Sequence, residues 1–295
     1  MRHERNVWVV GGDMRQAKLA ELLFDDGHTV HTWALEGTEK GPVRAPDLGE
    51  AALADCVILP LPAAGEGGRL NAPLSQERPP LTQVLDALRP SQVVCAGKVG
   101  RELLDQAKER GLRLVDYFTR EELAVANAVP TAEGAIQIAM EELPVTIHGA
   151  RVLVLGFGRL GKLLAHRLNA LGARVSVAAR KWADLAWAEA YGYGAEQIER
   201  LDGYLCGYDL VVNTVPVRVL DAERLADLRP GCLVIDLASK PGGVDFEAAV
   251  RQGVRAIWAL SLPGKVAPVT AAAILQTTIY HMLQELEQPG KEDAT

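Results

Sequence analysis

The same order of apolar runs, glycine turns and helix-like segments occurs twice along this chain of 295 residues. A run that begins at Val7 passes through Gly11 and Gly12 into an amphipathic segment, and a run that begins at Arg151 does the same through Gly156. Later runs correspond in the same order: DCVILPLP with DLVVNTVP, RPSQVVCAG with RPGCLVIDLAS, and RGLRLVDYF with QGVRAIWAL. A repeat of this size predicts two similar domains.

Short runs of Val, Ile and Leu, bounded by Gly, Pro and Asp, alternate with segments of helical period. This pattern is typical of parallel strands that helices bury on both faces. With 48% apolar side chains, the chain can bury two cores of ordinary size. We therefore predict an α/β protein built from two doubly wound, Rossmann-like domains with an interdomain cleft.

The boundaries of the parts follow from the repeat. We expect an N-terminal Rossmann-like domain for a substrate or partner at 1–128, a connecting helix at 129–148 and a nucleotide-binding domain at 149–266. Thr131 is expected to cap the connecting helix, with Glu133 in its first turn. Residues 267–295 are expected to form a C-terminal helix that begins near Pro268, packs back near the junction and ends in a frayed tail, PGKEDAT.

Charge and cysteine content exclude several classes of function. The net charge is -7 and no basic run is present that could follow a phosphate backbone, which argues against nucleic acid as a partner. The N-terminal apolar run is too short for a secretory or membrane segment, so we expect a cytoplasmic protein. The four cysteines are far apart, which predicts reduced thiols and no metal site: Cys56, Cys95, Cys206 and Cys232.

Gly156, Gly158 and Gly161 form a GxGxxG motif between a strand-like run and an amphipathic segment. In this context the first glycine permits a tight turn, the second lets a pyrophosphate approach the backbone, and the third lets the helix pack closely on the strand. We predict a dinucleotide site here that includes Arg159 and Leu160. The alternative is a turn that holds no ligand.

The second strand of this domain ends at Arg180 and Lys181, and no carboxylate follows until Asp184. An arginine accommodates the 2′-phosphate of NADP, whereas NAD sites usually carry Asp or Glu here, so NADP is favoured and NAD is the alternative. The two cations are otherwise solvated loop charges. The following loop is expected near the nicotinamide, unless it is only an Asx turn: Asn213, Thr214 and Pro216.

The turn of the first domain, Gly11 to Gln16, has the wrong spacing for a dinucleotide, and Asp13 would repel a pyrophosphate. We therefore assign this side to the substrate. Gly12 and Asp13 lie in the turn, and Arg15 can clamp a carboxylate. The alternative for Arg15 is an exposed side chain paired with Asp13.

A second loop that follows a strand carries Ser239 and Lys240, which suit an anionic substrate, although Lys240 could also be a solvated charge. No histidine falls in the loop ALSLPGKVAP, where a hydroxy-acid dehydrogenase would be expected to carry its general acid/base. This argues against that chemistry.

Several segments, taken in order over nearly the whole chain, resemble the A subunit of dipicolinate synthase: GGDMRQ, NAVPTAEGAI, TIHG followed by GFGRLG, DLASKPGGVDF and LPGKVAP. The resemblance implies an NADP-dependent oxidoreductase that works with a flavoprotein-like B subunit. Together they would oxidise dihydrodipicolinate to pyridine-2,6-dicarboxylate in the mother cell of a sporulating bacterium, and homo-oligomers are expected as well. The family has Arg where this chain has Lys240, which keeps the charge but loses bidentate geometry.

The implied dicarboxylate substrate needs cationic or N–H partners, and these are the predicted substrate-binding residues: Gly12, Asp13, Arg15, Thr131, Ala132, Gly134, Ser239, Lys240, Gly242 and Gly243. Glu133 is the candidate catalytic base, with simple helix-dipole stabilisation as the alternative. Two other functions stay open. In the first alternative the chain is another two-domain NADP-dependent dehydrogenase, which acts on an amino or imino acid. In the second it is a non-catalytic NADP-binding scaffold for the B subunit.

Overall fold

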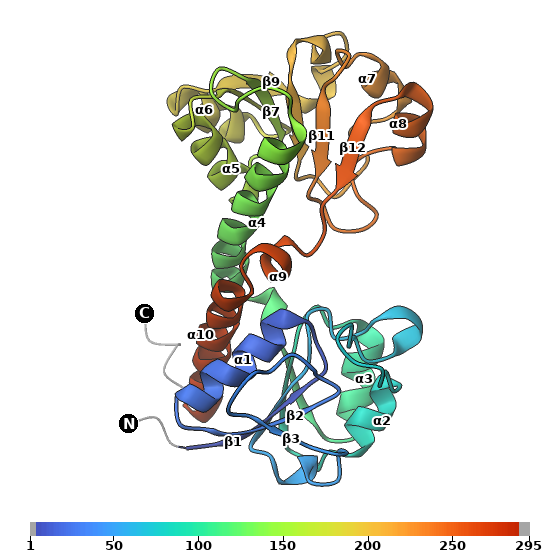
Figure 1. Cartoon of the computed structure of the whole chain (residues 1–295), viewed down its shortest axis with the longest axis vertical. Helices are drawn as coiled ribbons and strands as arrows, with labels where there is room; N and C mark the ends of the chain where they lie inside the picture. The colour runs from blue at the N-terminus through green and yellow to red at the C-terminus, as the bar shows by residue number, and fades with distance from the viewer. Residues whose placement is uncertain (1–3, 289–295) are drawn as a thin grey trace. The chain divides into compact units, whose positions relative to one another are not determined.

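The computed structural model describes residues 4–288, which form two compact units. Among these residues, unit 1 contains 4–127 together with 263–288, and unit 2 contains 128–262. Each unit is built on one six-stranded parallel sheet (Figure 1). This confirms the predicted fold class of two doubly wound α/β units.

In unit 1 the strand order is β3-β2-β1-β4-β5-β6. The strands are β1 (Asn6–Val10), β2 (Thr29–Trp33), β3 (Val43–Arg44), β4 (Cys56–Ile58), β5 (Val93–Ala96) and β6 (Arg113–Asp116). The helices are α1 (Met14–Asp25), α2 (Leu81–Asp86), α3 (Arg101–Glu109) and α10 (Pro268–Glu287). The sequence order changes direction between β1 and β4, and this is where open α/β sheets bind ligands.

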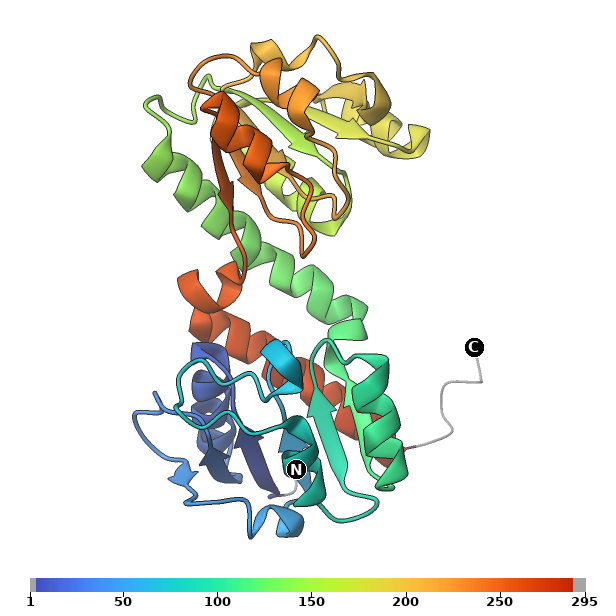
Figure 2. The ribbon, with the colours of Figure 1, turned by 90° about the vertical axis from the view of Figure 1, so that its right-hand side faces the viewer.

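The predicted C-terminal helix is present as α10, and it packs on unit 1. Figures 1 and 2 show α10 beside α1, and Leu275, Ile279 and Met282 share a buried cluster with Leu19 and Leu23 of α1. The helix begins at Pro268, where a missing backbone donor costs nothing. The expected frayed tail lies outside the described residues. None of the helices between residues 4 and 288 has both the length and the apolar character that a membrane span requires.

Unit 2 repeats the arrangement with strand order β12-β11-β10-β7-β8-β9. Its strands are β7 (Arg151–Leu155), β8 (Arg174–Ala179), β9 (Gly194–Gln197), β10 (Leu210–Asn213), β11 (Leu233–Asp236) and β12 (Arg255–Trp258). Its helices are α5 (Arg159–Ala170), α6 (Trp182–Ala190), α7 (Ala222–Ala226) and α8 (Phe246–Gln252). Two separate apolar clusters cover the two faces of the sheet, as expected for strands that are apolar along their whole length.

The helix expected at 129–148 begins earlier, because α4 spans Glu121–Glu142 and Pro130 lies inside it. Thr131 is therefore a mid-helix residue, and the predicted cap at this position is wrong. Leu123 and Ala128, which precede the proline, are buried. Their burial stabilises turns that Pro130 alone would not favour. The segment LPGKV forms a short helix, α9 (Leu262–Val266).

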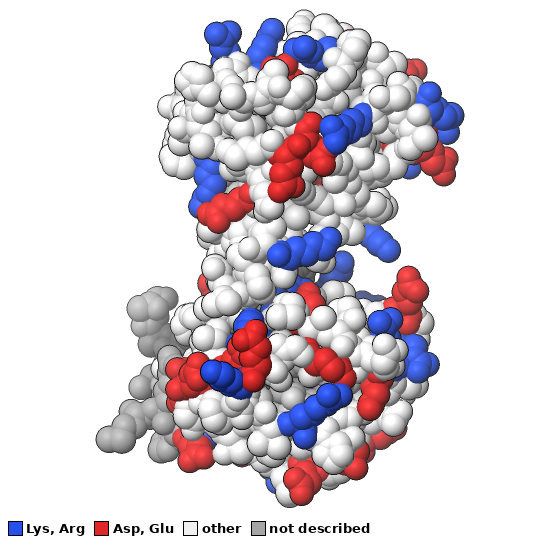
Figure 3. Space-filling model, viewed as in Figure 1, with Lys and Arg blue, Asp and Glu red and all other residues white. Residues whose placement is uncertain are grey.

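Figure 3 shows lysine and arginine side chains interspersed with aspartate and glutamate over the visible surface of both units. Many of these side chains are paired. In unit 1, for example, Arg120 contacts Glu285 at 2.6 Å and Glu122 at 2.7 Å. The visible surface thus shows no broad field of one sign.

Candidate functional site

The glycine turn of unit 2 has the geometry that its three glycines predict. Gly156 follows β7 with a φ of +95°, a conformation that favours glycine. A Cβ at Gly161 would overlap the carbonyl oxygen of Gly156, so this residue allows α5 to pack against the turn. A Cβ at Gly158 would meet no atom within 4 Å, because the N-cap of α5 faces open space. The amide end of α5 is therefore accessible to an anion.

A pocket of about 540 Å³ begins at this turn and runs along the carboxyl ends of the strands of unit 2. One side is formed by Gly156 and Phe157 and by Arg180 and Lys181 after β8. The other side is the loop that follows β10, from Val215 to Val219. A pocket of this size and place suits part of a dinucleotide.

Four cations line this pocket. Arg224 donates from Nε to Asp202 and from Nη1 to the carbonyl oxygen of Val219, at 2.8 and 2.9 Å, and Arg218 lies 3.4 Å from Asp245. Arg180 and Lys181, by contrast, take part in no ion pair within residues 4–288. Their charge is therefore available to an anionic group in the pocket.

The residues predicted for the cofactor fall into two sets. Gly156, Arg180, Lys181 and Pro216 line the pocket, and Gly158, Arg159, Leu160, Gly161, Asn213 and Thr214 do not. Arg218 and Arg224 were not predicted. Arg218 lies in the loop after β10 and Arg224 lies in α7, and neither residue belongs to a sequence motif.

Asn213 was expected near the nicotinamide, but its side chain has a structural role. Its side chain is fully buried and donates from Nδ2 to Asp236 Oδ1 at 2.7 Å and to the carbonyl oxygen of Val215 at 3.0 Å. Its Oδ1 accepts from the Val215 amide at 3.1 Å, which is the Asx turn of the alternative interpretation. Asn213 thus fixes the loop that forms one pocket wall, and its side chain cannot contact a ligand.

Asp236, which the sequence analysis did not select, connects this loop with the next. It is fully buried at the end of β11 and accepts from the amides of Ala238 and Gly243 at 3.0 and 2.8 Å. Of the four predicted substrate residues in that loop, Gly242 and Gly243 are buried and Ser239 and Lys240 are exposed. The exposed pair is accessible, whereas the glycines hold the loop's shape.

In unit 1 the turn after β1 contains a carboxylate, that of Asp13, which caps the following helix. Asp13 caps α1 and accepts from the amide of Arg15 at 3.0 Å, and Gln16 Oε1 accepts from the Asp13 amide at 3.2 Å. The Gln16 side chain also fills the space beside Gly12. The helix dipole and the first amides are thus satisfied within the chain.

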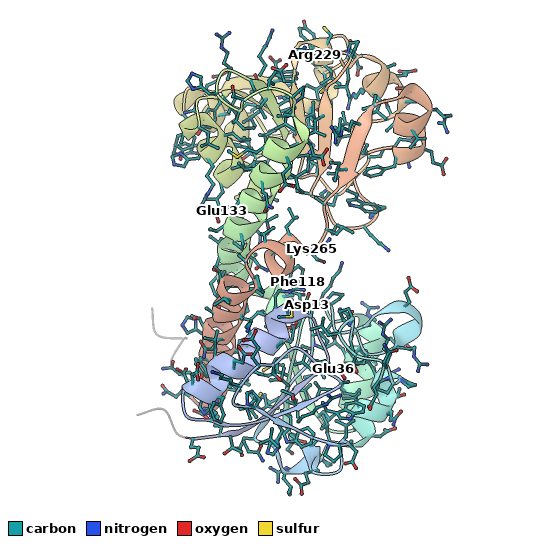
Figure 4. All side chains as sticks on the ribbon, in the orientation of Figure 1. Asp13, Glu36, Phe118, Glu133, Arg229 and Lys265 are labelled. Carbon is teal, nitrogen blue, oxygen red and sulfur yellow. The ribbon has the colours of Figure 1, made fainter. Side chains whose placement is uncertain are left out.

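Arg15 is buried rather than exposed, with 5% of its surface accessible. Its Nε and Nη2 contact the carboxylate of Asp13, and Nη2 also donates to the carbonyl oxygen of Leu61 at 2.8 Å. The Nε and Nη2 groups are thus used within the chain, and the alternative interpretation of a pair with Asp13 applies to a buried side chain. A Cβ on Gly264 would lie 2.9 Å from Arg15 Nε, so the backbone of α9 covers the pair. Figure 4 labels Asp13 and Lys265, the residue after Gly264.

The predicted residues of the connecting helix do not form an anion site. Thr131 to Gly134 lie within α4, and their amides follow ten helical residues, so no helix start presents them to a substrate. Ala132 and Gly134 are buried. Glu133 is exposed on α4 (Figure 4), with Oε1 3.8 Å from Arg167 Nη2. Because Glu133 is exposed and does not line the dinucleotide pocket, its place does not support the predicted role as catalytic base.

The comparisons with known proteins agree with this arrangement. Residues 6–118 match the N-terminal domain of the dipicolinate synthase A subunit, and residues 122–295 match the alanine dehydrogenase/PNT C-terminal domain. The chain is 34% identical to the dipicolinate synthase A subunit of Bacillus subtilis (strain 168), over 96% of this chain and 97% of that protein.

Two solved structures show the same likeness. The dipicolinate synthase A chain from Bacillus subtilis superposes with a TM-score of 0.86 at 33% identity and covers 97% of this chain and 98% of that chain. A transhydrogenase from Sinorhizobium meliloti, at 17% identity and a TM-score of 0.70 over 95% of this chain and 94% of that one, shares the fold.

The fold, the glycine turn and the C-terminal domain match define a two-unit α/β protein with an NAD(P)-binding domain of the alanine dehydrogenase/PNT type. Within that class, the chain belongs to the family of dipicolinate synthase A subunits.

Proposed function

We propose that this chain is the NADP-dependent A subunit of a dipicolinate synthase. In this proposal it oxidises dihydrodipicolinate to pyridine-2,6-dicarboxylate in the mother-cell cytoplasm of a sporulating bacterium, together with a flavoprotein-like B subunit. The main support is the open amide end of α5 at Gly158, together with Arg180 and Lys181, which line the pocket that begins at Gly156 and form no ion pair within residues 4–288, in a chain of this family.

Aromatisation of a dihydropyridine removes a hydride and a proton, and NADP⁺ supplies the hydride acceptor when it is bound. The amides at Gly158 would hold the pyrophosphate. Arg180 and Lys181 would pair with the 2′-phosphate. The buried Asn213–Asp236 pair would keep the opposite wall of the pocket in place.

The substrate carries two carboxylates, and unit 1 offers two cations close to its sheet switch point. Arg15 is held rigidly by Asp13 and Leu61, and within residues 4–288 no hydrogen bond uses its Nη1. Lys265 is exposed and adjoins Gly264, which contacts the Arg15–Asp13 pair. We propose these two groups of unit 1 for the carboxylates.

A second candidate function is the non-catalytic scaffold, in which the chain binds NADP(H) and supports the B subunit. Two observations favour it. Glu133, the predicted base, lies on an exposed helix face beside Arg167, and the Arg15 guanidinium is largely committed to Asp13. Neither residue has the free geometry of a catalytic group.

The two candidates differ in one assay. Purified protein is mixed with freshly generated dihydrodipicolinate and NADP⁺, with and without the B subunit, and both pyridine-dicarboxylate and NADPH absorbance are followed. Equal formation of the two products by this chain alone supports the oxidoreductase. Product that forms only with the B subunit, without NADPH, supports the scaffold. Gly158→Asp is the matched control and should remove any NADPH signal.

A further inference from the structure

The loops that follow β5 and β6 of unit 1 present a cation and an aromatic ring. Lys98 is the second residue after β5, and Phe118 is the second residue after β6. Lys98 is exposed, and in the described part of the chain its ammonium group has no partner. Phe118 is 43% exposed, and Figure 4 shows it at the edge of unit 1 that carries Asp13. The carboxyl ends of parallel strands meet at this edge, where open α/β sheets bind ligands.

The carboxylate of Asp116 connects the two loops. Its Oδ1 accepts from the amides of Lys98 and Phe118 at 3.0 and 2.8 Å. Its Oδ2 accepts from the amide of Val99 at 2.8 Å. Because two of these amide nitrogens contact the same oxygen atom, the backbones of Lys98 and Phe118 are neighbours. One carboxylate thus fixes the positions from which the cation and the ring extend.

The backbone of Lys98 has a conformation that lysine rarely adopts. Its φ is +53°, in the left-handed region that favours glycine. The hydrogen bonds from the amides of Lys98 and Val99 to Asp116 hold the chain in this conformation. Residues that are held against their backbone preference cluster at functional sites. Glycine would suit the same backbone, so the fold of this loop does not require a lysine.

The same loops adjoin Arg15. A Cβ at Gly97 would lie 2.5 Å from the ring of Tyr117 and 2.8 Å from Leu61 Cδ1, so Gly97 packs between them. The carbonyl oxygen of Leu61 in turn accepts from Arg15 Nη2 at 2.8 Å. Arg15 has only Nη1 left for a ligand, and one nitrogen pairs with one of the two oxygens of a carboxylate. Lys98, the residue after Gly97, brings a second, flexible cation to this neighbourhood.

We propose that Lys98 and Phe118 form a subsite for a planar pyridine carboxylate in unit 1. The ring of Phe118 stacks on the pyridine ring, and Lys98 pairs with the carboxylate oxygen that Arg15 does not bind. This inference rests on the proposed function, from which it takes the pyridine dicarboxylate. It adds the side chain that recognises the ring and a further cation for one carboxylate.

The first test is isothermal titration of the full chain, saturated with NADP⁺, with pyridine-2,6-dicarboxylate. Lys98→Gly should lower the affinity by roughly tenfold and raise the KM for dihydrodipicolinate in parallel, because it removes the cation. Its melting temperature should stay the same or rise, since glycine suits the backbone. Lys98→Arg keeps the charge and should retain most of the affinity. Ser91→Gly is the matched control, because Ser91 has a φ of +69° at the opposite end of β5.

The second test separates the ring from the carboxylate. Phe118→Leu keeps an apolar side chain without an aromatic ring, so it should weaken pyridine-2,6-dicarboxylate binding by roughly fivefold. Binding of glutarate, an aliphatic dicarboxylate of matching length, should not change in this variant. Lys98→Gly should weaken both ligands. Equal losses of the two ligands in Phe118→Leu would overturn the stacking contact.

The outcomes distinguish this inference from the proposed function. A wild type that binds and forms pyridine-2,6-dicarboxylate, with Lys98→Gly and Phe118→Leu equal to it in affinity and KM, would overturn the subsite alone. A wild type that neither binds this compound nor forms it from dihydrodipicolinate would overturn both.

Discussion

The two glycine turns, after β1 in unit 1 and after β7 in unit 2, occupy the same place in the same topology, but they cap the N-terminus of the following helix differently. In unit 1, Asp13 supplies a carboxylate to the amides of α1. In unit 2, Gly158 supplies no side chain to the amides of α5. A helix N-terminus that is capped by a carboxylate of its own chain attracts a phosphate weakly. An uncapped N-terminus retains its full electrostatic attraction for a phosphate.

The ends of the second strands differ in the same sense. β2 leads into Trp33, Ala34 and Leu35, which are all buried and apolar. β8 leads into Arg180 and Lys181, which line the pocket of unit 2. A fold that is repeated in one chain can thus keep its architecture in both copies while only one copy keeps the chemistry of a dinucleotide site.

The largest effect is expected when unit 2 is given the carboxylate of unit 1. Gly158→Asp fits the extended backbone at that position, where φ is -78° and ψ is -162°. A carboxylate about 4 Å from a phosphate costs about 4 kcal/mol at an effective dielectric constant near 20, so NADPH affinity should fall by roughly 1,000-fold. NADPH fluorescence titration measures this. The neutral isostere Gly158→Asn is the control, and equal losses in both variants would contradict the electrostatic explanation.

The reverse change in unit 1 should alter stability instead of cofactor binding. Asp13→Ala leaves the buried Arg15 guanidinium without its carboxylate and α1 without its cap, which should lower the free energy of unfolding by about 3 kcal/mol. Urea denaturation gives this value, and NADPH affinity should not change. Asp13→Asn keeps the cap acceptor and separates the two causes. A clear loss of NADPH affinity would show that the two turns are not independent.

A smaller effect concerns the choice between NADP(H) and NAD(H). Arg180→Asp should weaken NADPH binding about tenfold more than NADH binding, because only NADPH presents a 2′-phosphate to this side chain. Arg174→Asp, an exposed residue at the start of the same strand, is the matched control. Equal losses for both cofactors in the Arg180 variant would remove the argument for a 2′-phosphate contact.

The smallest effect is a pH dependence confined to unit 1. A hydrogen bond from Arg120 lowers the pKa of Glu285 below its ordinary value of 4.5. The stability linked to this carboxylate is therefore present above pH 4.5 and is lost as the pH falls through the lowered pKa. Glu285→Gln should cost about 0.5 kcal/mol at pH 7 and reduce the fall in melting temperature on acidification.

Melting curves between neutral and acidic pH measure this effect. Glu109→Gln, an exposed residue at the end of α3, should leave the pH profile unchanged. A Glu285→Gln profile that is parallel to the wild type would mean that the pair does not contribute to the acid sensitivity of unit 1.

The sequence was sufficient to predict both sheets and the dinucleotide turn, because apolar period and glycine spacing are local signals. Gly156, Gly158 and Gly161 each have the geometry that their order implies. Arg180 could be predicted at the pocket because it directly follows a strand. These features depend on neighbours in the chain and on no long-range contact.

The misses share the opposite property. The pairing of Arg15 includes the carbonyl oxygen of Leu61, 46 residues away, and the pairing of Asn213 includes Asp236, 23 residues away on the adjacent strand. Thr131 follows a proline and resembles a helix cap, but the burial of earlier residues extends α4 back to Glu121. Only the packed structure determines these partners.

Isothermal titration of the wild-type chain with NADPH tests the contrast between the two units most directly, since it counts sites. The account predicts one NADPH per chain, bound more tightly than NADH, and no detectable binding to Gly158→Asp. Two molecules per chain, or one molecule whose binding survives that substitution, would contradict the claim that only the uncapped turn of unit 2 holds the dinucleotide.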